Sequence, residues 1–289
     1  MDKVTILYSD VEDPLALAIP SDTRVHKIHV DELASFFRKD ERWAVPTFSA
    51  PDRIRSRFHG RVVLNRIFNL QSTKLGALLQ SWGFHELWVH FLLSELLAES
   101  ARLVHDTGPR GVSRTLLPLN SQWLMVNDLE YAISTPAYVY NFGGELVELD
   151  AIDNPIQKSV WSLFDWRQER HLPAGEAAWH RFFVQKPTGS PVLCYFFDID
   201  RLGEDGLAVV PLRDPVSIPM DKMLTLAKLL ATKFASAIGE FLIYVGEDEN
   251  IRFHAFSPYL KTASSHGDFV PLFNRWLESH QSVTRFGHE

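Results

Sequence analysis

The segment from residue 221 to 256 constrains the fold more than any other part of this sequence. Between residues 221 and 238 apolar side chains recur every three or four positions, and Gly239 follows where a helix would stop. Apolar runs at 241–245 and 251–256 then flank an acidic turn. The pattern predicts an amphipathic helix packed on an antiparallel hairpin. The helix residues expected to face the core are Met223, Leu226, Leu230, Phe234, Ala237 and Ile238.

Two further strands and a closing helix complete the expected carboxy-terminal part. Residues 192–199 and 207–212 are rich in β-forming side chains and are joined by a turn with glycines at positions 203 and 206. Asp268 precedes a helical pattern that runs towards the end of the chain. The residues of this helix expected to point inward are Val270, Phe273, Trp276 and Leu277.

The first third of the chain has the pattern of a small open α/β lobe. Strands are expected at 4–8, 25–30 and 61–64, with a helix at 32–38 after Asp31. Residues 76–105 have helical spacing with a break at Gly83. A hairpin is expected at 137–149, with Gly143 and Gly144 in its turn.

These elements predict a mixed α/β fold in two parts. The expected parts are a small amino-terminal α/β lobe with a helical segment, residues 1–110, and a carboxy-terminal lobe with an antiparallel sheet and helices, residues 111–289. The boundary is placed at the loop around Pro109, which lies between two glycines.

Composition and charge exclude several classes of protein. Hydrophobic residues make up 46% of the 289 positions, enough for a core, and the formal net charge of −7 argues against a general nucleic-acid binder. The one cysteine, Cys194, cannot form an internal disulfide, and it lies in an apolar strand typical of a buried small hydrophobe. No apolar run is long enough to span a membrane. We therefore expect a cytoplasmic protein.

The order of elements in the last third, with two upstream segments, resembles the ATP-grasp ligases, among them glutathione synthetase and ribosomal-peptide ligases. The upstream segments are the run Val63 to Arg66 and the Pro-containing joint from Asn154 to Lys158. The resemblance covers most of the chain, which is short for this family. It implies binding of ATP and Mg²⁺ and the joining of a carboxylate to an amine through an acyl phosphate.

The sequence departs from the family where the metal is held. The resemblance places His254 and Phe256 at the positions of a Glu and an Asn that bind magnesium, an ion that strongly prefers oxygen ligands. Strict alternation would put Arg252, His254 and Phe256 on the face lining the cleft, and Ile251, Phe253 and Ala255 on the core face. We therefore predict no metal ligand set at this position. An active enzyme would need ligands from elsewhere, for which the candidates are Asp198, Asp200, Glu204, Asp205 and Asp214.

Two lysines are candidates for nucleotide contact by the same resemblance. Lys158 follows the Pro-containing joint, and Lys186 precedes Pro187 as in the strand that leads into the family's phosphate-covering loop. The glycine-rich part of that loop is missing after Ser190, where the chain continues directly into a strand.

Basic and aromatic residues supply the candidate partner surface. Arginines gather at positions 53–66 of an otherwise acidic chain, and guanidinium groups bind carboxylates and phosphates in bidentate geometry. A solvated loop is the alternative explanation. Trp161 and Trp166 are either core residues or the lining of a groove. The arginines are Arg53, Arg55, Arg57, Arg61 and Arg66.

Other motifs do not identify a reaction. His85 and His90 are five residues apart, whereas a zinc-hydrolase helix needs a spacing of four. The sequence has no Walker loop, dinucleotide fingerprint or nucleophile elbow. No catalytic residue is assigned.

Three hypotheses about function remain open at this point. The favoured one is a catalytically degenerate ATP-grasp-like protein that binds a peptide or a protein partner. The second is an active ATP-dependent carboxylate–amine ligase acting on a peptide or an amino acid, with ATP and Mg²⁺ as its cofactors. The third is an unrelated α/β binding protein. Substrate, partner and oligomeric state do not follow from the sequence.

Overall fold

A computed structural model gives the three-dimensional structure of the protein. It describes residues 4–42, 45–49, 51–84, 93–95, 97–98, 100, 102–104, 117–129, 131–142, 152–161, 163–164, 180–216, 218–247 and 250–281. The chain divides into two compact units, one of Met1–Thr115 with Ser264–Glu289 and one of Leu116–Ala263. The domain boundary expected near residue 110 lies outside the described residues. We describe each unit by itself.

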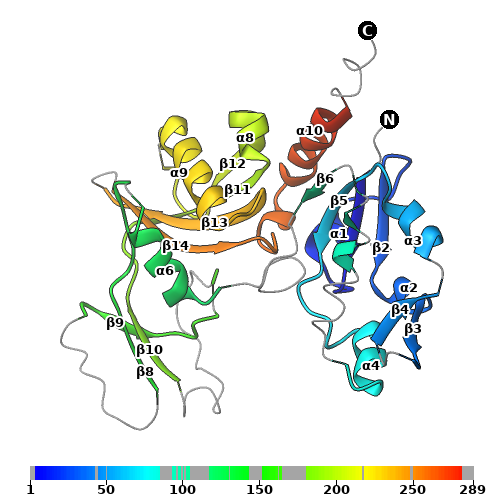
Figure 1. Cartoon of the computed structure of the whole chain (residues 1–289). Helices are drawn as coiled ribbons and strands as arrows, with labels where there is room; N and C mark the ends of the chain where they lie inside the picture. Colours follow the sequence, from blue (N-terminus) through cyan, green and yellow to red (C-terminus); the bar gives the residue numbers. More distant parts are fainter. Residues whose placement is uncertain are drawn as a thin grey trace. The chain divides into compact units, whose positions relative to one another are not determined.

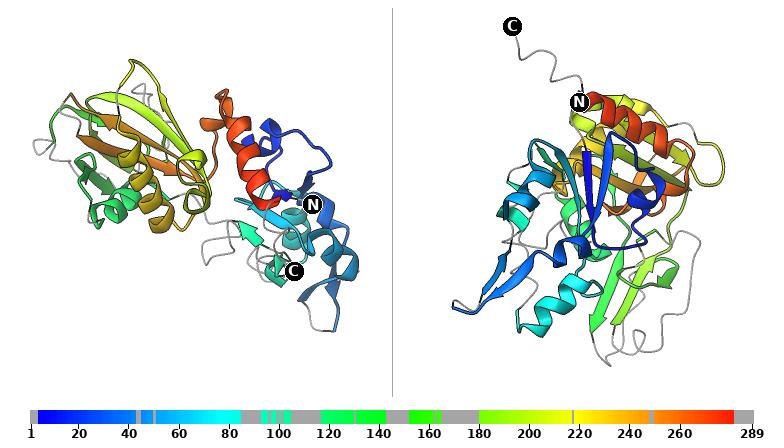
Figure 2. Two further views of the ribbon diagram at one scale, coloured as in Figure 1. Left: turned by 90° about the horizontal axis from the view of Figure 1, so that it is seen from above. Right: turned by 90° about the vertical axis from the view of Figure 1, so that its right-hand side faces the viewer.

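The first unit is built on a parallel sheet with the strand order β2-β1-β5-β6. Its inner strands β1 and β5 are almost entirely buried, as expected for parallel strands whose two faces are both covered. Figure 2 gives two further views of the strands of this unit. The elements of this unit are β1 (Val4–Tyr8), α1 (Pro14–Ala18), β2 (Val25–His29), α2 (Asp31–Ala34), β3 (Phe37–Asp40), β4 (Val45–Phe48), α3 (Pro51–Phe58), β5 (Val62–Arg66), α4 (Lys74–Ser81), β6 (Arg102–Val104) and α10 (Phe269–Gln281).

Three predicted strands and the closing helix of this unit are confirmed, and two predicted helical regions are partly wrong. The helix expected at 32–38 is the single turn α2, after which β3 pairs with β4 and brings Phe37 against Phe48, with ring centroids 4.7 Å apart. Residues 102–104 form a strand on β5, where helical spacing was expected to continue. In both places strand pairing overrides local helical preference, with the neighbouring β4 in the first case and with the more distant β5 in the second.

The break predicted at Gly83 is confirmed. Helix α4 ends at Ser81, and Gly83 has a positive φ of 76°, a conformation that glycine adopts without strain. Most of the second helix expected after this break lies outside the described residues.

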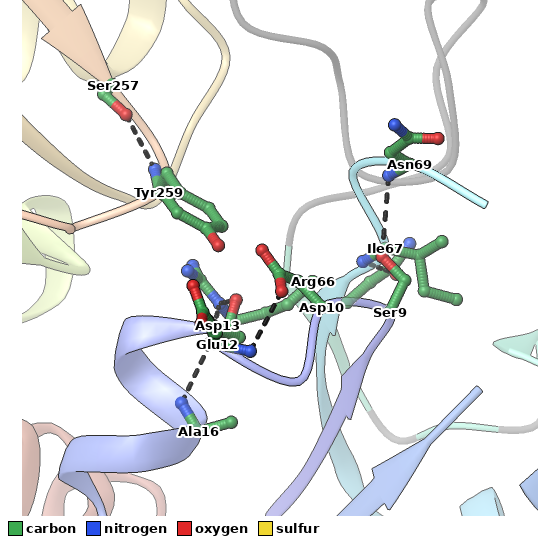
Figure 3. Close-up of polar contacts among 11 residues, drawn as sticks. Ser9, Asp10, Glu12, Asp13, Ala16, Arg66, Ile67, Asn69, Ser257 and Tyr259 are labelled. Atoms are coloured by element: carbon green, nitrogen blue, oxygen red, sulfur yellow. Dashed lines mark hydrogen bonds and ion pairs between the residues drawn. The ribbon is translucent and has the colours of Figure 1, made fainter. Parts of the chain in front are cut away.

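A fully buried ion pair joins two elements at the carboxyl ends of β1 and β5. Arg66 Nε donates to both carboxylate oxygens of Asp13 at 3.1 and 2.9 Å, and neither side chain is exposed to solvent (Figure 3). Asp13 Oδ1 also accepts a hydrogen bond from Ala16 N and so caps helix α1, whose first residue is Pro14. One carboxylate thus neutralises a buried cation and starts a helix.

The second unit contains a larger sheet with the order β12-β11-β13-β14-β7. The strands are antiparallel except for β7, which runs parallel to β14. A second sheet has the order β8-β10-β9. The elements are α6 (Leu119–Asn127), β7 (Ile133–Ser134), β8 (Tyr138–Phe142), β9 (Pro155–Gln157), β10 (His180–Gln185), β11 (Ser190–Phe197), α8 (Ile199–Leu202), η1 (Gly203–Gly206), β12 (Leu207–Pro211), α9 (Met220–Lys233), β13 (Ile238–Val245), β14 (Ile251–Ser257) and η2 (Ala263–Ser265), which continues into the first unit.

Helix α9 covers one face of the larger sheet and α6 lies on the other (Figure 1). Asp221 in the first turn of α9 and Lys233 in the last complement the helix dipole. The predicted buried face is confirmed for Met223, Leu226 and Leu230, which have no exposed surface, and for the nearly buried Phe234.

The predicted end of this helix is wrong. Helix α9 ends at Lys233, and Ile238 and Gly239, expected at the end of the helix, lie in β13.

The predictions for β11 to β14 are also confirmed. The two pairs β11–β12 and β13–β14 are antiparallel as expected. Cys194 on β11 is buried, and burial raises the pKa of its thiol, which keeps it in the neutral form. The first strand of the hairpin expected at 137–149 is β8, whereas the rest of that hairpin lies outside the described residues. None of the helices within the described residues is long and apolar enough to cross a membrane.

Loss of the Leu230 side chain should leave a cavity under α9. We expect Leu230→Ala to lower the free energy of unfolding by about 2–5 kcal/mol, the range for truncation of a buried leucine. Urea unfolding followed by circular dichroism measures this change. Lys228→Ala, on the exposed face of the same helix, is the control and should be almost neutral. An unchanged midpoint for Leu230→Ala would contradict this assignment.

Removing one member of the buried ion pair should cost more than removing both. We expect Arg66→Met to destabilise by about 3–5 kcal/mol, because the Asp13 carboxylate stays buried without its cation. The double variant Asp13→Asn/Arg66→Met should recover part of this loss, since Asn can still cap α1. Thermal unfolding of the four proteins of the cycle tests this. Arg24→Met, which breaks the exposed pair with Asp22, should cost less than about 1 kcal/mol.

Candidate functional site

Strand β14 carries a β-bulge at the residue where the resemblance places a metal ligand. Its pairing with β13 shifts between Leu242, opposite Ala255, and Ile243, opposite Phe253, so that His254 is the extra residue. A bulge interrupts the alternation of side chains. His254 and Ala255 therefore both lie on the face of the sheet opposite α9.

The predicted placement of Phe256 with Arg252 and His254 is wrong because of this bulge. The Phe256 ring lies parallel to the ring of Phe234 at the end of α9, with centroids 4.5 Å apart and an interplanar angle of 3°. Gly239 makes room for it, since a Cβ there would lie 2.5 Å from the Phe256 ring. Phe256 is therefore a core residue on the α9 face, and Ala255 takes its place on the other face.

Helix α6 closes the edge of β14 beyond the short strand β7. The side-chain amide of Gln122 accepts from Phe256 N at 2.6 Å and donates to Phe256 O at 3.0 Å, as a neighbouring strand would. Trp123 Nε1 donates to His254 O at 2.7 Å. The backbone polar groups that a sheet edge exposes are thus satisfied by side chains.

A lysine–histidine pair, Lys158 and His254, links the two sheets of this unit. Lys158 directly follows β9, and its Nζ lies 3.0 Å from Nε2 of His254. His254 has no exposed surface and Lys158 almost none. The imidazole lies against the rings of Trp123 and Tyr244, with centroids 6.2 and 5.5 Å away.

The electrostatics of this pair favour a neutral imidazole beside an ammonium group. Burial lowers the pKa of His254 well below its ordinary value, and the positive charge of Lys158 lowers it further. With Nε2 unprotonated, the imidazole accepts a hydrogen bond from Lys158. The Nδ1 of His254 is buried and has no hydrogen-bond partner among the described residues.

The donor set at this position does not fit a magnesium ion. Mg²⁺ takes oxygen ligands in near-octahedral geometry, whereas the groups present are an ammonium, an imidazole and aromatic rings. The candidate acids lie elsewhere: Asp198 is buried at the end of β11, and the other four are exposed on α8, η1 and the loop after β12. Within the described residues, no three His, Cys, Asp or Glu side chains are placed to share a metal ion.

Arg252 and Lys186 line a cavity of about 210 Å³. Arg252, half-buried on β14, donates from Nη1 to Thr188 Oγ1. Lys186 is exposed and follows β10. Lys186 and Arg252 therefore line the same cavity, whereas Lys158 lies elsewhere, beside His254. The cavity is lined by Ser134, Thr135, Pro136, Gln185, Lys186, Pro187, Tyr244, Arg252 and Phe253.

Three of the five arginines of the basic stretch lie on a helix, not on the loop considered from the sequence. Arg53, Arg55 and Arg57 lie on α3, where Arg55 pairs with Glu95 and Asp52, and Arg57 pairs with Glu32. Arg53 is exposed and lies over the Phe36 ring, 5.7 Å from its centroid, and Arg61 is half-buried. The prediction that Arg66 belongs to a partner-binding surface is wrong, because Arg66 is fully buried against Asp13.

Several other candidates can be placed only in part. Trp161 is 58% exposed, while Trp166 lies outside the described residues. His85 and His90 also lie outside the described residues. The roles of Gln122 and Trp123 were not predicted, since neither local spacing nor charge in the sequence marks a side chain that binds the edge of a distant strand.

Comparisons with known proteins show the fold of this chain. No protein-family model matches it, and no curated protein matches it significantly. Several solved structures match it. One is the ATP-grasp ligase PsnB complexed with precursor peptide PsnA2 and AMPPNP, with a TM-score of 0.56 and 14% sequence identity. This match covers 96% of this chain and 98% of the PsnB chain. The macrocyclase MdnC from Microcystis aeruginosa MRC, bound with precursor peptide MdnA, has a TM-score of 0.55 at 11% identity, covering 97% and 100%.

A third similar structure is D-alanine–D-alanine ligase from Bacillus anthracis complexed with ATP. Its TM-score is 0.50 at 10% identity, and the match covers 98% of each chain. The protein therefore has the ATP-grasp ligase fold along nearly its whole length, which confirms the fold expected from the resemblance.

The buried imidazole should make stability depend on pH in the acid range. The unfolded chain binds a proton at His254 below pH about 6.5, whereas the folded chain with its lowered pKa does not. Stability is therefore full above this pH and should fall below it, by up to about 1.4 kcal/mol per pH unit. Thermal unfolding between neutral and mildly acidic pH measures how steeply the melting temperature falls with pH. We expect this fall to be smaller for His254→Gln, whose side-chain amide can still accept a hydrogen bond from Lys158.

The exposed His59 gives the matched control, since His59→Gln should retain the wild-type slope. Identical pH slopes for wild type and His254→Gln would contradict a neutral, buried His254.

Proposed function

We propose that this protein is a catalytically degenerate member of the ATP-grasp fold that binds a peptide or a protein partner instead of ligating one. One observation carries the proposal. The buried pair Lys158–His254 occupies the position at which the resemblance places an oxygen ligand of magnesium.

The charges of the pair oppose metal binding. A divalent cation beside His254 would lie within a few ångströms of the Lys158 ammonium, and repulsion between like charges is strong where water is excluded. The second ligand position does not compensate, since Phe256 faces α9. Without Mg²⁺ the phosphates of ATP would lack the ion that neutralises them during transfer.

The peptide-binding part of the proposal is supported by similar structures. PsnB was solved with the precursor peptide PsnA2 and MdnC with the precursor peptide MdnA. We propose a peptide or protein as the partner of this chain as well. Peptide binding requires shape and surface chemistry but no metal.

Two surfaces are candidates for this role. On and just after α3, internal ion pairs engage Arg55 and Arg57, so we propose Arg53 on the helix and Arg61 behind it as the arginines that a partner would contact. On the second unit, Arg252 and Lys186 line a cavity without a carboxylate among its lining residues. We favour the second surface, because its two cations lie in a cavity, whereas Arg53 and Arg61 lie on the outside of the first unit.

The test is whether the protein binds and turns over MgATP. We expect no rise in melting temperature at millimolar MgATP, because a ligand that binds only the native state would raise it by mass action. We also expect no magnesium-dependent release of ADP above background, with peptide or amino-acid substrates present or absent.

The variant His254→Gln should behave like the wild type in both assays. Magnesium-dependent turnover that is abolished by Lys158→Ala or by Lys186→Ala would overturn the proposal and support the active carboxylate–amine ligase instead. A shift with ATP that EDTA does not alter would place nucleotide binding without the metal and would leave the proposed loss of catalysis standing.

A further inference from the structure

Two arginines on helix α3 are held beside one aromatic ring. Arg53 and Arg57 lie four residues apart on the helix, and their guanidinium carbons are 5.7 and 5.6 Å from the centroid of the Phe36 ring. A guanidinium group at this distance is attracted by the ring, and the attraction does not use its N–H groups as hydrogen-bond donors. Phe36 therefore helps to order two cations at the surface without neutralising them.

The N–H groups of both arginines are available to a ligand. In the part of the chain that the structure describes, neither Arg53 nor Arg57 donates a hydrogen bond from its side chain. Arg55 on the same helix differs, because its Nη2 donates to Glu95 Oε1 at 3.1 Å. Since a guanidinium carries five N–H donors in a planar fork, Arg53 and Arg57 can both bind an acceptor from another molecule.

The ion pair between Arg57 and Glu32 is a weak internal competitor for such a ligand. Glu32 is anchored by its Oε1, which accepts a hydrogen bond from His29 N at 3.0 Å. Its Oε2 lies 3.6 Å from Nη1 of Arg57, which is too long for a hydrogen bond, and both side chains are partly exposed. Exposed pairs of this kind contribute little. A carboxylate that approaches Arg57 closely enough for two parallel hydrogen bonds would bind it better.

We propose that Arg53, Arg57 and Phe36 form a docking surface for an extended acidic segment of a protein partner, with carboxylates at alternate positions of that segment. The proposal goes beyond the proposed function, because it concerns a separate surface on the first unit and does not depend on the loss of metal binding.

The spacing of the two arginines fits this segment. Residues four apart on a helix are separated by about 6 Å along its axis. Side chains at alternate positions of an extended chain point to the same side and recur about every 6.5 Å. Two carboxylates at alternate positions can therefore bind Arg53 and Arg57 at the same time. Carboxylates on adjacent residues point to opposite sides, so one of them would face away from the helix.

The experiment is an NMR titration of the isotope-labelled full chain with defined probes. The probes are acetyl-Ala-Glu-Ala-Glu-Ala-amide, its isomer acetyl-Ala-Glu-Glu-Ala-Ala-amide, acetyl-Ala-Gln-Ala-Gln-Ala-amide and inorganic phosphate. We expect the alternating Glu peptide at millimolar concentration to shift the side-chain Nε–Hε resonances of Arg53 and Arg57. The isomer should bind more weakly and the Gln peptide should cause almost no shift. The affinity of the alternating peptide should fall with added salt.

Substitutions test the three residues of the surface. Arg53→Gln and Arg57→Gln should each weaken binding of the alternating peptide about fivefold, the upper end for one exposed ion pair. Phe36→Leu keeps an apolar side chain but removes the ring that orders both cations, so it should weaken binding by a smaller factor. Arg213→Gln, an exposed arginine on the second unit, is the matched control and should bind like the wild type.

Removing the internal competitor should strengthen binding. Glu32→Gln takes the negative charge from beside Arg57, while the amide oxygen can still accept the hydrogen bond from His29 N. We expect a higher affinity for the alternating peptide, which loss of a structural contact alone would not produce. Unchanged or weaker binding by this variant would remove Arg57 from the surface.

Other results would overturn the proposal as a whole. Equal shifts with the Glu and Gln peptides, or unchanged affinity in both arginine variants, would exclude recognition of carboxylates by these arginines. Equal binding of the two Glu isomers would exclude an extended segment read at alternate positions. Shifts with phosphate and none with the alternating peptide would make this an inorganic anion site instead.

The failure of this proposal and that of the proposed function are distinguishable. Magnesium-dependent ATP turnover together with Arg53-dependent peptide binding would remove the degeneracy and keep the docking surface. Absence of both turnover and shifts at Arg53 and Arg57 would remove the docking surface and keep the degeneracy.

Discussion

The hydrogen bonds between α6 and the open edge of β14 are the constraint on which the second unit depends. The side-chain amide of Gln122 forms hydrogen bonds with the backbone N–H and C=O of Phe256, and the Trp123 indole donates to the carbonyl of His254. These bonds hold the helix across the strand at the point where the strand bulges. The indole of Trp123 then stacks on Phe182 of β10, with centroids 5.7 Å apart. One helix therefore ties the larger sheet to the smaller one and removes His254 from water.

Arg66 and Lys158, two buried cations in the described part of the chain, have different partners. In the first unit Arg66 meets the carboxylate of Asp13, so the pair has no net charge. In the second unit Lys158 meets a neutral imidazole, and this pair keeps a positive charge. The imidazole accepts a hydrogen bond from Lys158 and, being neutral, adds no negative charge beside it.

The sequence predicted the elements whose information is local. The spacing of Met223, Leu226 and Leu230 defines a buried helix face, and this face is observed. The antiparallel partners of β11 and β13 follow from apolar runs around short turns. The general fold followed from the order of these elements, and the solved ATP-grasp structures match it.

What the sequence could not predict depends on residues far apart in the chain. Nothing near Arg66 indicates that Asp13 will bury it, so an arginine in a basic stretch was expected at the surface. The bulge at His254 has no local mark either, because it depends on how β14 meets β13 and Gln122. A single extra residue moved Phe256 from the expected cleft to the core. The sequence therefore predicts which residue types lie on β14 but not the face of the sheet on which each side chain lies.

The bulge also bears on how this protein could change over evolutionary time. Substitution of Glu at position 254 and of Asn at position 256 would place the two side chains on opposite faces of β14, because the extra residue of the bulge changes the alternation between them. The Asn would enter the space that Phe256 fills against Phe234, and the Glu would face Lys158 alone. A shared metal site at positions 254 and 256 would therefore need a deletion in the strand together with both substitutions, so the bulge separates this strand from metal coordination by more than a change of side chains.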